Sequence, residues 1–159
     1  MDPLVYIEPA TMEHARILAP LMRQADVDEV MASHGYTPIE ALEAGVNQSE
    51  VAWAGFLNGD LVGLFGISRR PFLSTTAVPW LLTGVGVEKH PRAFWKACRV
   101  IVADWREQFA GVEMEQFVDA RHERALRWAA RLGFHVEPAM PFGAAGLPFH
   151  RISMSGRKL

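Results

Sequence analysis

Cysteine is nearly absent from this sequence, which holds only Cys98 among its 159 residues. One thiol cannot form a disulfide bond within the chain, so the sequence fits a reducing compartment. Cys98 also falls on the apolar side of an expected helix, where packing is favoured over nucleophilic chemistry. The six histidines lack the paired spacing of metal motifs, and we expect no metal site.

An excess of positive charge and long apolar runs are also lacking. The net charge is −2, so the composition does not favour binding to the phosphates of a nucleic acid. No run approaches the roughly 18 apolar residues of a membrane-spanning helix, and the N-terminus shows no basic and apolar leader pattern. The sequence therefore predicts a cytoplasmic protein that binds neither nucleic acid nor membrane.

The composition that remains is typical of a globular protein. Half of the residues are apolar and 21% are charged. A chain of this length can bury a substantial core. The sequence shows no repeats, low-complexity tracts or linkers, so we expect one domain over residues 1–159.

Short-range signals predict the first elements. Residues 4–8 are β-rich and indicate a strand. Thr11 is a suitable N-cap for a following helix, which we expect to reach Met31. Pro20 lies inside that pattern and should kink or divide the helix, because proline cannot donate the backbone hydrogen bond.

A capping pattern and a hairpin signal come next. Residues 37–40 read Thr-Pro-Ile-Glu, which begins a helix through a capping box, and Gly45 can end it. The β-rich runs 51–57 and 61–67 flank Asn58-Gly59. This dipeptide predicts a tight hairpin, because both turn residues need a positive φ.

The centre of the chain predicts a β-α-β-α succession. It consists of a strand over residues 77–85, a helix over 92–109, a strand over 112–119 and a helix that ends at Gly133. Crossovers of this length can return the chain to the same sheet. A ligand of such a unit binds beyond the strand ends, near a helix N-terminus, so we expect a site at the turn from Val85 to Arg92.

The remaining segments complete one sheet. Pro79 should lie at the start of its strand or at a bulge. After Gly133, residues 135–136 begin a strand, 138–148 form a Gly/Pro-rich connection, and 149–154 alternate as a closing strand. The order predicts an α/β (α+β) fold with a mixed sheet of about seven strands and helices on both faces.

The element order and residues 125–134, Ala-Leu-Arg-Trp-Ala-Ala-Arg-Leu-Gly-Phe, resemble the GNAT N-acetyltransferase superfamily. Its members carry the pattern Asn-x-x-Ala-x-x-x-Tyr-x-x-x-Gly-Phe in this helix. The resemblance implies a mostly antiparallel GNAT-like sheet, acetyl-CoA as cofactor and an amine as acyl acceptor.

The resemblance also implies cofactor-binding residues. Val85 and Val87 would lie at the end of the fourth strand, and Arg92 and Ala97 would match parts of the pyrophosphate loop. Trp95 replaces the middle glycine of that loop, and its indole should obstruct the approach of the phosphates. An ordinary helix start at Pro91 explains the same residues equally well.

The helix motif departs from the family twice. His122 stands where the family has Asn and is our last candidate for cofactor binding. Ala129 stands where the family has a Tyr that protonates the departing thiolate, so that role is empty or is supplied elsewhere. Asp26 and Glu29 are the candidates for the general base, with a solvated helix face and an Arg23–Asp26 ion pair as the alternative.

A narrower resemblance involves a phage family with an acetyltransferase-like fold. It rests on Arg23-x-Ala25-Asp26-x-x-Glu29, Trp80-Leu81-Leu82, and Val118-Asp119 leading into Arg127-Trp128. It implies a non-catalytic virion-assembly protein of the bacterial host cell, with a phage or host protein as partner.

Three functions therefore stay open: an acyltransferase, a structural scaffold, and a sensor that binds CoA without transfer. A gap between the fourth and fifth strands would favour a cofactor slot. A gap filled by Trp95 or Trp80 would favour the scaffold.

Overall fold

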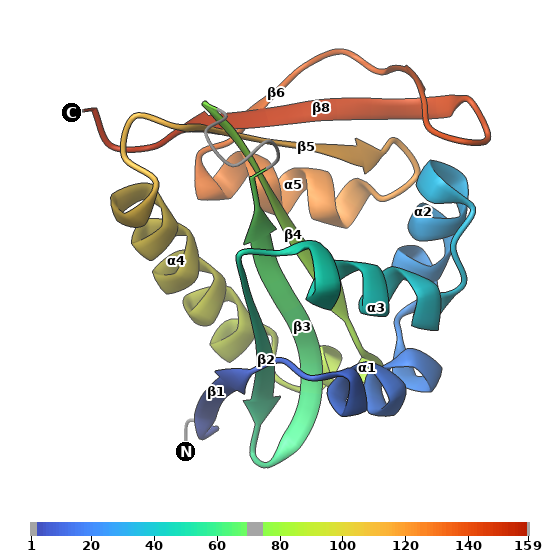
Figure 1. Ribbon diagram of the computed structural model, residues 1–159, viewed down its shortest axis with the longest axis vertical. Helices are drawn as coiled ribbons and strands as arrows, with labels where there is room; N and C mark the ends of the chain where they lie inside the picture. Colours follow the sequence, from blue (N-terminus) through green and yellow to red (C-terminus); the bar gives the residue numbers. More distant parts are fainter. Residues whose placement is uncertain (1–2, 70–74, 159) are drawn as a thin grey trace.

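The computed structural model describes residues 3–69 and 75–158. Eight strands form one sheet in the order β1-β2-β3-β4-β5-β8-β6, and β7 pairs with β8 (Figure 1). All strand pairs are antiparallel except β4–β5. The predicted mixed, mostly antiparallel sheet is therefore confirmed. The strands are β1 Val5–Pro9, β2 Val51–Leu57, β3 Asp60–Ser68, β4 Thr76–Thr83, β5 Glu113–Asp119, β6 His135–Val136, β7 Met140–Phe142 and β8 Leu147–Ser155.

Helices cover both faces of the sheet. The helices are α1 Met12–Leu18, α2 Gln24–His34, α3 Pro38–Gln48, α4 Pro91–Gln108 and α5 Glu123–Leu132, with short 3₁₀ segments at Ala19–Leu21 (η1) and Val85–Lys89 (η2). One core cluster lies under α4 and α5 and includes Trp105, Met114 and Ala129. A second lies under α1, α2 and α3 and includes Leu18 and Leu42. Within residues 3–69 and 75–158, no helix combines the length and apolarity needed to cross a membrane.

The helix starts follow the predicted caps. The Thr11 hydroxyl accepts a hydrogen bond from the His14 backbone N–H, and Thr37 accepts one from Glu40 in a reciprocal capping box. Pro20 divides the first helical stretch, as predicted, because α1 ends before it and η1 follows. The second part, α2, runs to His34 and not only to Met31.

Asn58 and Gly59 form the predicted hairpin turn with φ values of 51° and 86°. Gly45, in contrast, does not end its helix, since α3 continues to Gln48. A Cβ atom on Gly45 would lie 2.8 Å from the Trp80 indole. The glycine is therefore needed for close packing of α3 on β4 and not as a helix stop.

Two other boundaries were wrong. β4 ends at Thr83, and Val85 lies in η2, because the backbone turns toward α4 directly after Gly84. The connection over residues 138–148 contains β7 and the first residues of β8. Its glycines sit in the turn between these strands, where Gly143 and Gly146 have positive φ.

Pro79 lies in the middle of β4, opposite Ile67, and not at a strand start or a bulge. Its carbonyl accepts a hydrogen bond from Nε2 of Gln116 in β5 at 2.8 Å. The N–H that proline lacks would also face β5, because both backbone groups of a strand residue point to one side. β4 and β5 pair only at residues 76–77 and 113–114, so proline is tolerated where the strands already separate.

Candidate functional site

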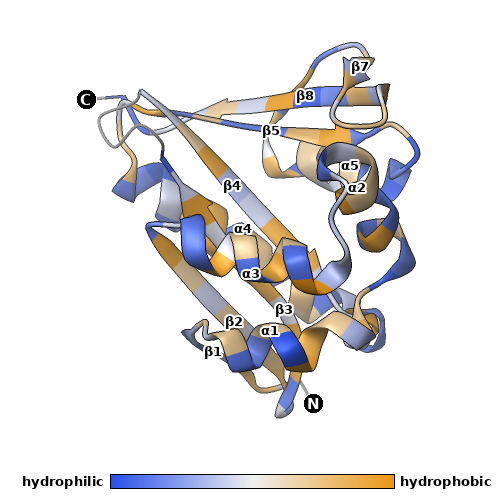
Figure 2. Ribbon diagram, turned by 45° about the vertical axis from the view of Figure 1, so that its right-hand side comes forward, coloured by the Kyte–Doolittle hydropathy of each residue, from blue (hydrophilic) through white to orange (hydrophobic). Residues whose placement is uncertain are grey.

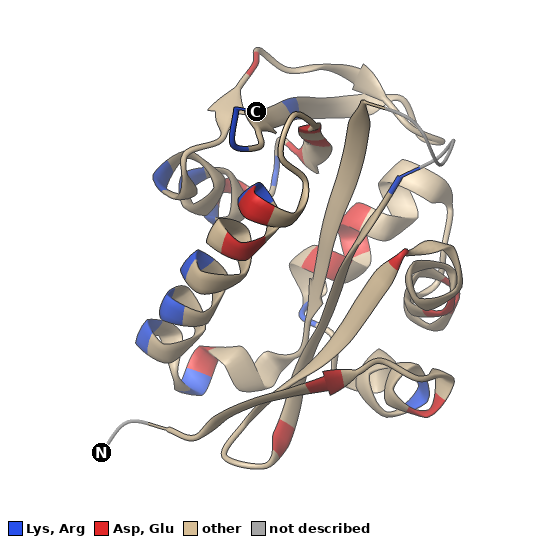
Figure 3. Cartoon of the chain, turned by 60° about the vertical axis from the view of Figure 1, so that its left-hand side comes forward, with Lys and Arg blue, Asp and Glu red and all other residues tan. Residues whose placement is uncertain are grey.

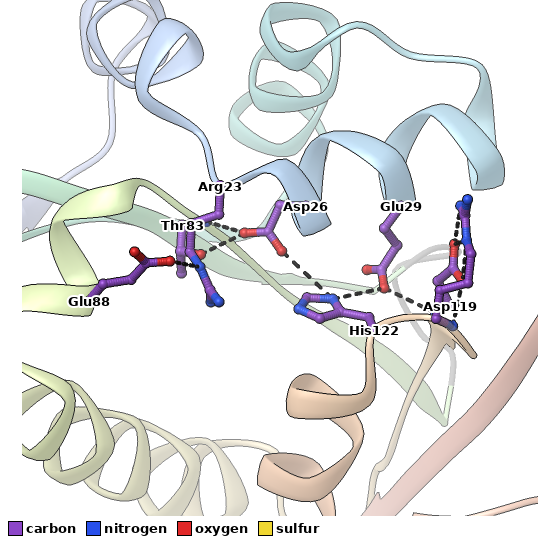
Figure 4. A network of polar contacts seen from close by, with 8 residues as sticks. Arg23, Asp26, Glu29, Thr83, Glu88, Asp119 and His122 are labelled. Atoms are coloured by element: carbon purple, nitrogen blue, oxygen red, sulfur yellow. Dashed lines mark hydrogen bonds and ion pairs between the residues drawn. The ribbon is translucent and has the colours of Figure 1, made fainter.

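The site lies where β4 and β5 diverge, and Asp26 of α2 closes the β4 side. One oxygen of this carboxylate accepts hydrogen bonds from the Thr83 backbone N–H at 2.8 Å and from the Thr83 hydroxyl at 2.6 Å (Figure 4). Asp26 is buried, with only 5% of its surface exposed to solvent. The helix is thereby anchored to the end of β4.

Glu29, one turn further along α2, reaches the end of β5. Its Oε2 accepts a hydrogen bond from the Asp119 backbone N–H at 3.0 Å. Residues three apart share one face of a helix, so the two carboxylates hold the ends of two separated strands. α2 thus spans the open end of the gap.

His122, the residue before α5, lies between these carboxylates. Its Nδ1 is 3.4 Å from Glu29 Oε2 and 3.9 Å from Asp26 Oδ1 (Figure 4). Burial lowers the pKa of the imidazole, but the hydrogen bond and charge of Glu29 and the charge of Asp26 outweigh burial. The pKa of His122 is therefore raised, which favours the imidazolium.

The expected Arg23–Asp26 ion pair does not form. Nε of Arg23 contacts Oε1 of Glu88 at 3.3 Å instead, and Asp26 is committed to Thr83. The solvated-face alternative therefore does not describe Asp26. Asp28, two residues along, is exposed and accepts a hydrogen bond from Gln24.

A cavity of about 430 Å³ extends through the gap. Its lining residues come from helices on both faces of the sheet. We call its two parts the rear slot, between α4 and α5, and the front chamber, between α2, α3 and β7. The rear slot is lined by Phe94, Ala97, Cys98, Ile101 and Trp128, and the front chamber by Ser33, Tyr36, Gln48, Trp80, Phe117 and Phe142. Asp26, Glu29 and His122 also line the cavity.

The predicted site residues fall into two groups. Asp26, Glu29, Ala97 and His122 line one cavity. Val85, Val87 and Arg92 lie along the connection from η2 into α4, outside that lining. Of these three, Val87 is buried against Leu57 and Val62, whereas Val85 and Arg92 are exposed.

Trp95 is not among the residues that line the cavity, so it does not fill the gap. Its ring packs edge-on against Trp128 with centroids 5.7 Å apart, and the Arg131 guanidinium lies 4.6 Å from its centroid. The side chain therefore points along α5, since position 95 does not lie on the helix face that Ala97 and Cys98 present to the cavity. Trp80 does not fill the gap either, because its Nε1 donates to Ser49 of α3 at 2.6 Å.

Burial raises the pKa of the Cys98 thiol to about 12. The thiolate needed for nucleophilic chemistry is thus disfavoured, although the residue borders the rear slot. In the part of the chain that the structure describes, no group of three or more His, Cys, Asp or Glu side chains could hold a metal ion.

No protein-family model and no curated protein matches this chain. Solved structures do. RimL, a ribosomal L7/L12 α-N-protein acetyltransferase in complex with coenzyme A, superposes with a TM-score of 0.69 at 8% identity, over 95% of this chain and 93% of that one. A GNAT-family acetyltransferase from Streptococcus pneumoniae superposes with a TM-score of 0.63 at 15% identity, over 95% of this chain and 98% of that one. A spermidine N-acetyltransferase from Vibrio cholerae, in complex with CoA and spermine, superposes with a TM-score of 0.68 at 12% identity, over 96% of this chain and 95% of that one.

The chain has the GNAT fold. Identities this low establish the fold alone, and these three structures give no support to the narrower phage family. Within this GNAT fold, Ala129 lines the cavity, but its methyl side chain has no proton to donate. His122, seven residues earlier in the motif, also lines the cavity and lies beside Glu29 and Asp26.

Sequence reasoning did not identify Thr83, Gln116 and Phe142 as cavity residues. Thr83 follows the apolar run Trp80-Leu81-Leu82 in β4, a signal that could have marked it. Gln116 offered no such signal, because β5 also contains Glu113, Glu115 and Asp119. Phe142 offered none either, because its place depends on β7 pairing with β8, which brings the ring of Phe142 onto that of Phe117.

Proposed function

We propose that this protein is an N-acyltransferase that moves an acetyl group from acetyl-CoA to a primary amine. The observation that carries the proposal is the early separation of β4 from β5, which opens a cavity with two carboxylates and an imidazole at its centre. The CoA complexes among proteins of the same fold support this choice of cofactor.

The residues present suit a CoA thioester. The residues that line the rear slot are mostly apolar, so the methylene and methyl groups of the pantetheine arm can pack against them. Leu81 lies between Pro79 and Thr83 on β4, so its backbone groups also face the gap, beyond the last β4–β5 pair. These groups can bond the amides of the arm.

The start of α4 suits the phosphates. Its first backbone N–H groups have no partner within the helix, and Arg92 is the second helical residue. Basic residues lie along the first half of α4 (Figure 3). They are Arg92, Lys96 and Arg99, all exposed. We assign Arg92 to the pyrophosphate, with Val85 and Val87 shaping the connection before it.

Each polar side chain at the centre then has a role. Acetyl-CoA, when bound, supplies an acetyl group activated as a thioester. Glu29 accepts a proton from the ammonium group so that the free amine can attack, and Asp26 adds negative charge that attracts the ammonium. The new C–N bond forms as the C–S bond breaks.

His122 donates the proton that the departing sulfur needs. Its Nδ1 faces the carboxylates, so Nε2 is the nitrogen directed away from them (Figure 4). The amine nitrogen loses two protons in all, of which one ends on sulfur and one reaches solvent. Nδ1 keeps its own proton beside the carboxylates throughout, so Nε2 regains a proton from water to restore the imidazolium, and Glu29 releases the protons taken from the amine to water. His122 would thus replace the Tyr that this chain lacks at Ala129.

Isothermal titration with acetyl-CoA, and with desulfo-CoA for comparison, tests the proposal. We expect micromolar binding of both, because the slot and the α4 start hold the arm and the phosphates. Arg92→Glu should abolish the heat, whereas Arg106→Glu, an exposed change in the last turn of α4, should not. No heat at millimolar ligand contradicts the proposal.

A second candidate is a non-catalytic phage virion-assembly protein that keeps this fold as a scaffold. The absence of a hydroxyl at Ala129 is the observation that favours it. It predicts no binding of acetyl-CoA and a stable complex with a phage or host protein. The same titration therefore separates the two candidates.

A further inference from the structure

The front chamber combines four aromatic side chains, Tyr36, Trp80, Phe117 and Phe142, with the two carboxylates of α2. We infer that it selects a primary amine with an aromatic or similarly apolar body, rather than a polyamine or a basic peptide. The inference rests on the proposed function, which makes an amine the acceptor, and it adds the class of that amine.

One wall is the stacked pair Phe117 and Phe142. Their rings are 4.0 Å apart between centroids and nearly parallel, at 4°. The turn after β7 fixes Phe142, because Ala144 N–H donates to the Ser33 carbonyl at 2.9 Å. A Cβ on Gly143 would lie 2.7 Å from Ser33, which explains a glycine there. β7 and its turn thus close over the end of α2 (Figure 2).

The opposite wall consists of Trp80 and Tyr36. Ser49 holds the Trp80 indole by the hydrogen bond described above, and the ring lies on Gly45. His34 stacks on Tyr36 with centroids 5.2 Å apart and an angle of 14°. Four partly buried aromatic rings therefore surround the space that an acceptor would occupy.

The charges limit the acceptor to one ammonium group. Among the described residues, Asp26 and Glu29 are the only acidic side chains that line the cavity, and both lie beside His122 where β4 and β5 diverge. A polyamine would bring a second ammonium into the aromatic part, where no carboxylate would pair with it. An amine with one ammonium group on an apolar body can pair its charge with the carboxylates and pack its body against the aromatic rings.

The test compares 2-phenylethylamine with spermidine by isothermal titration, on the protein alone and with desulfo-CoA present. We expect 2-phenylethylamine to bind at least tenfold more tightly. Phe142→Ala should weaken 2-phenylethylamine about tenfold through lost ring contacts. The matched control is Met140→Ala, a change at an exposed residue of the same strand that does not line the cavity.

A gain-of-affinity variant tests the charge argument. Gln48→Glu places a carboxylate on the lining of the chamber, at an exposed position of α3. We expect it to raise the affinity for spermidine and to leave that for 2-phenylethylamine nearly unchanged.

Each outcome bears on one proposal or on both. Tighter binding of spermidine to the wild type, or no effect of Phe142→Ala, overturns the acceptor class even if acetyl-CoA binds. Selective binding of 2-phenylethylamine without binding of acetyl-CoA supports the acceptor class and contradicts the transferase. If neither amine binds, the acceptor class is overturned.

Discussion

His122 and the two carboxylates around it come from distant parts of the chain. Glu29 and His122 are 93 positions apart, and their side chains meet only because α2 spans the gap between β4 and β5. Opposite charges at this distance, with little exposure to water, favour the protonated imidazole. The raised pKa of His122 is therefore a property of the assembled site.

Glu29→Gln should lower the pKa of His122 toward or below its usual value. The amide keeps the shape of the side chain and can still accept from the Asp119 N–H, but it removes the charge that favours the imidazolium. NMR titration of the His122 ring protons measures the change. Asp28→Asn, an exposed change one position away, should leave the pKa in place. An unshifted pKa in Glu29→Gln would refute the electrostatic coupling.

The same group makes stability depend on pH. The folded state holds the proton of His122 more tightly than the unfolded chain, because its folded pKa is raised. Its contribution to the free energy of unfolding is complete below about pH 6.5, the unfolded value, and is lost as the pH rises through the folded value. Urea unfolding at several pH values should show this decline.

His122→Gln should remove that part of the decline, whatever its effect on the absolute stability. The exposed residue His135 supplies the control, since His135→Gln should keep the slope of the wild type. If the free energy of unfolding fell with pH equally steeply in the wild type and in His122→Gln, the prediction would be contradicted.

At the scale of elements, β4 shapes the cavity. Pro79 withholds a hydrogen bond on the side facing β5, and Gln116 bridges the two strands at the point where they part. On its other neighbour, β4 keeps a regular antiparallel register with β3 up to Thr83. The strand is thus firmly held on one side and open on the other.

Gly45→Ala should destabilise the protein, although alanine is the better helix former. Helix propensity alone would favour the change by about 1 kcal/mol. The new methyl group would meet the Trp80 indole at 2.8 Å, and overpacking of this kind costs about 1–3 kcal/mol. Thermal unfolding measures the balance.

The double variant Gly45→Ala with Trp80→Phe provides the control, because the smaller ring makes room for the methyl group. Gly45→Ala should lower the stability less in the Trp80→Phe background than in the wild type. Equal losses in both backgrounds would show that the contact with Trp80 is not the cause.

At the scale of the whole molecule, the sheet separates two layers of core packing, and the cavity passes from one layer to the other where β4 and β5 diverge. The sheet carries one cluster under α4 and α5 and another under α1, α2 and α3. Contacts across the gap are mainly the polar ones of Asp26, Glu29 and Gln116. A ligand that fills the gap would therefore add contacts to both halves of the sheet.

Saturation with acetyl-CoA should raise the melting temperature. A ligand at a hundred times its Kd stabilises the folded state by about 2.7 kcal/mol. For a protein of this size, that corresponds to a rise of about 5–10 °C. Calorimetry with and without ligand measures it, and Arg92→Glu should cancel the rise. A rise of the same size in Arg92→Glu would remove Arg92 from the proposed site.

The sequence by itself determined the elements and their order. Asn58-Gly59 specified the hairpin and Thr37 with Glu40 specified a helix start, because such signals depend on φ values and hydrogen bonds within a few residues. The order of strands and helices, with the motif up to Phe134, then led to the GNAT fold, which the solved structures confirm.

Only the tertiary structure decided how the site is assembled. The sequence predicted a helix-ending Gly45 and, as an alternative to a base, an Arg23–Asp26 pair, and both were wrong. Their partners lie far away in the chain: Trp80 for Gly45, Thr83 for Asp26 and Glu88 for Arg23. The direction of the Trp95 ring, toward Trp128 and Arg131, likewise depends on another element. Side-chain direction and charge pairing are set by packing between elements, and no short-range pattern encodes which elements will meet.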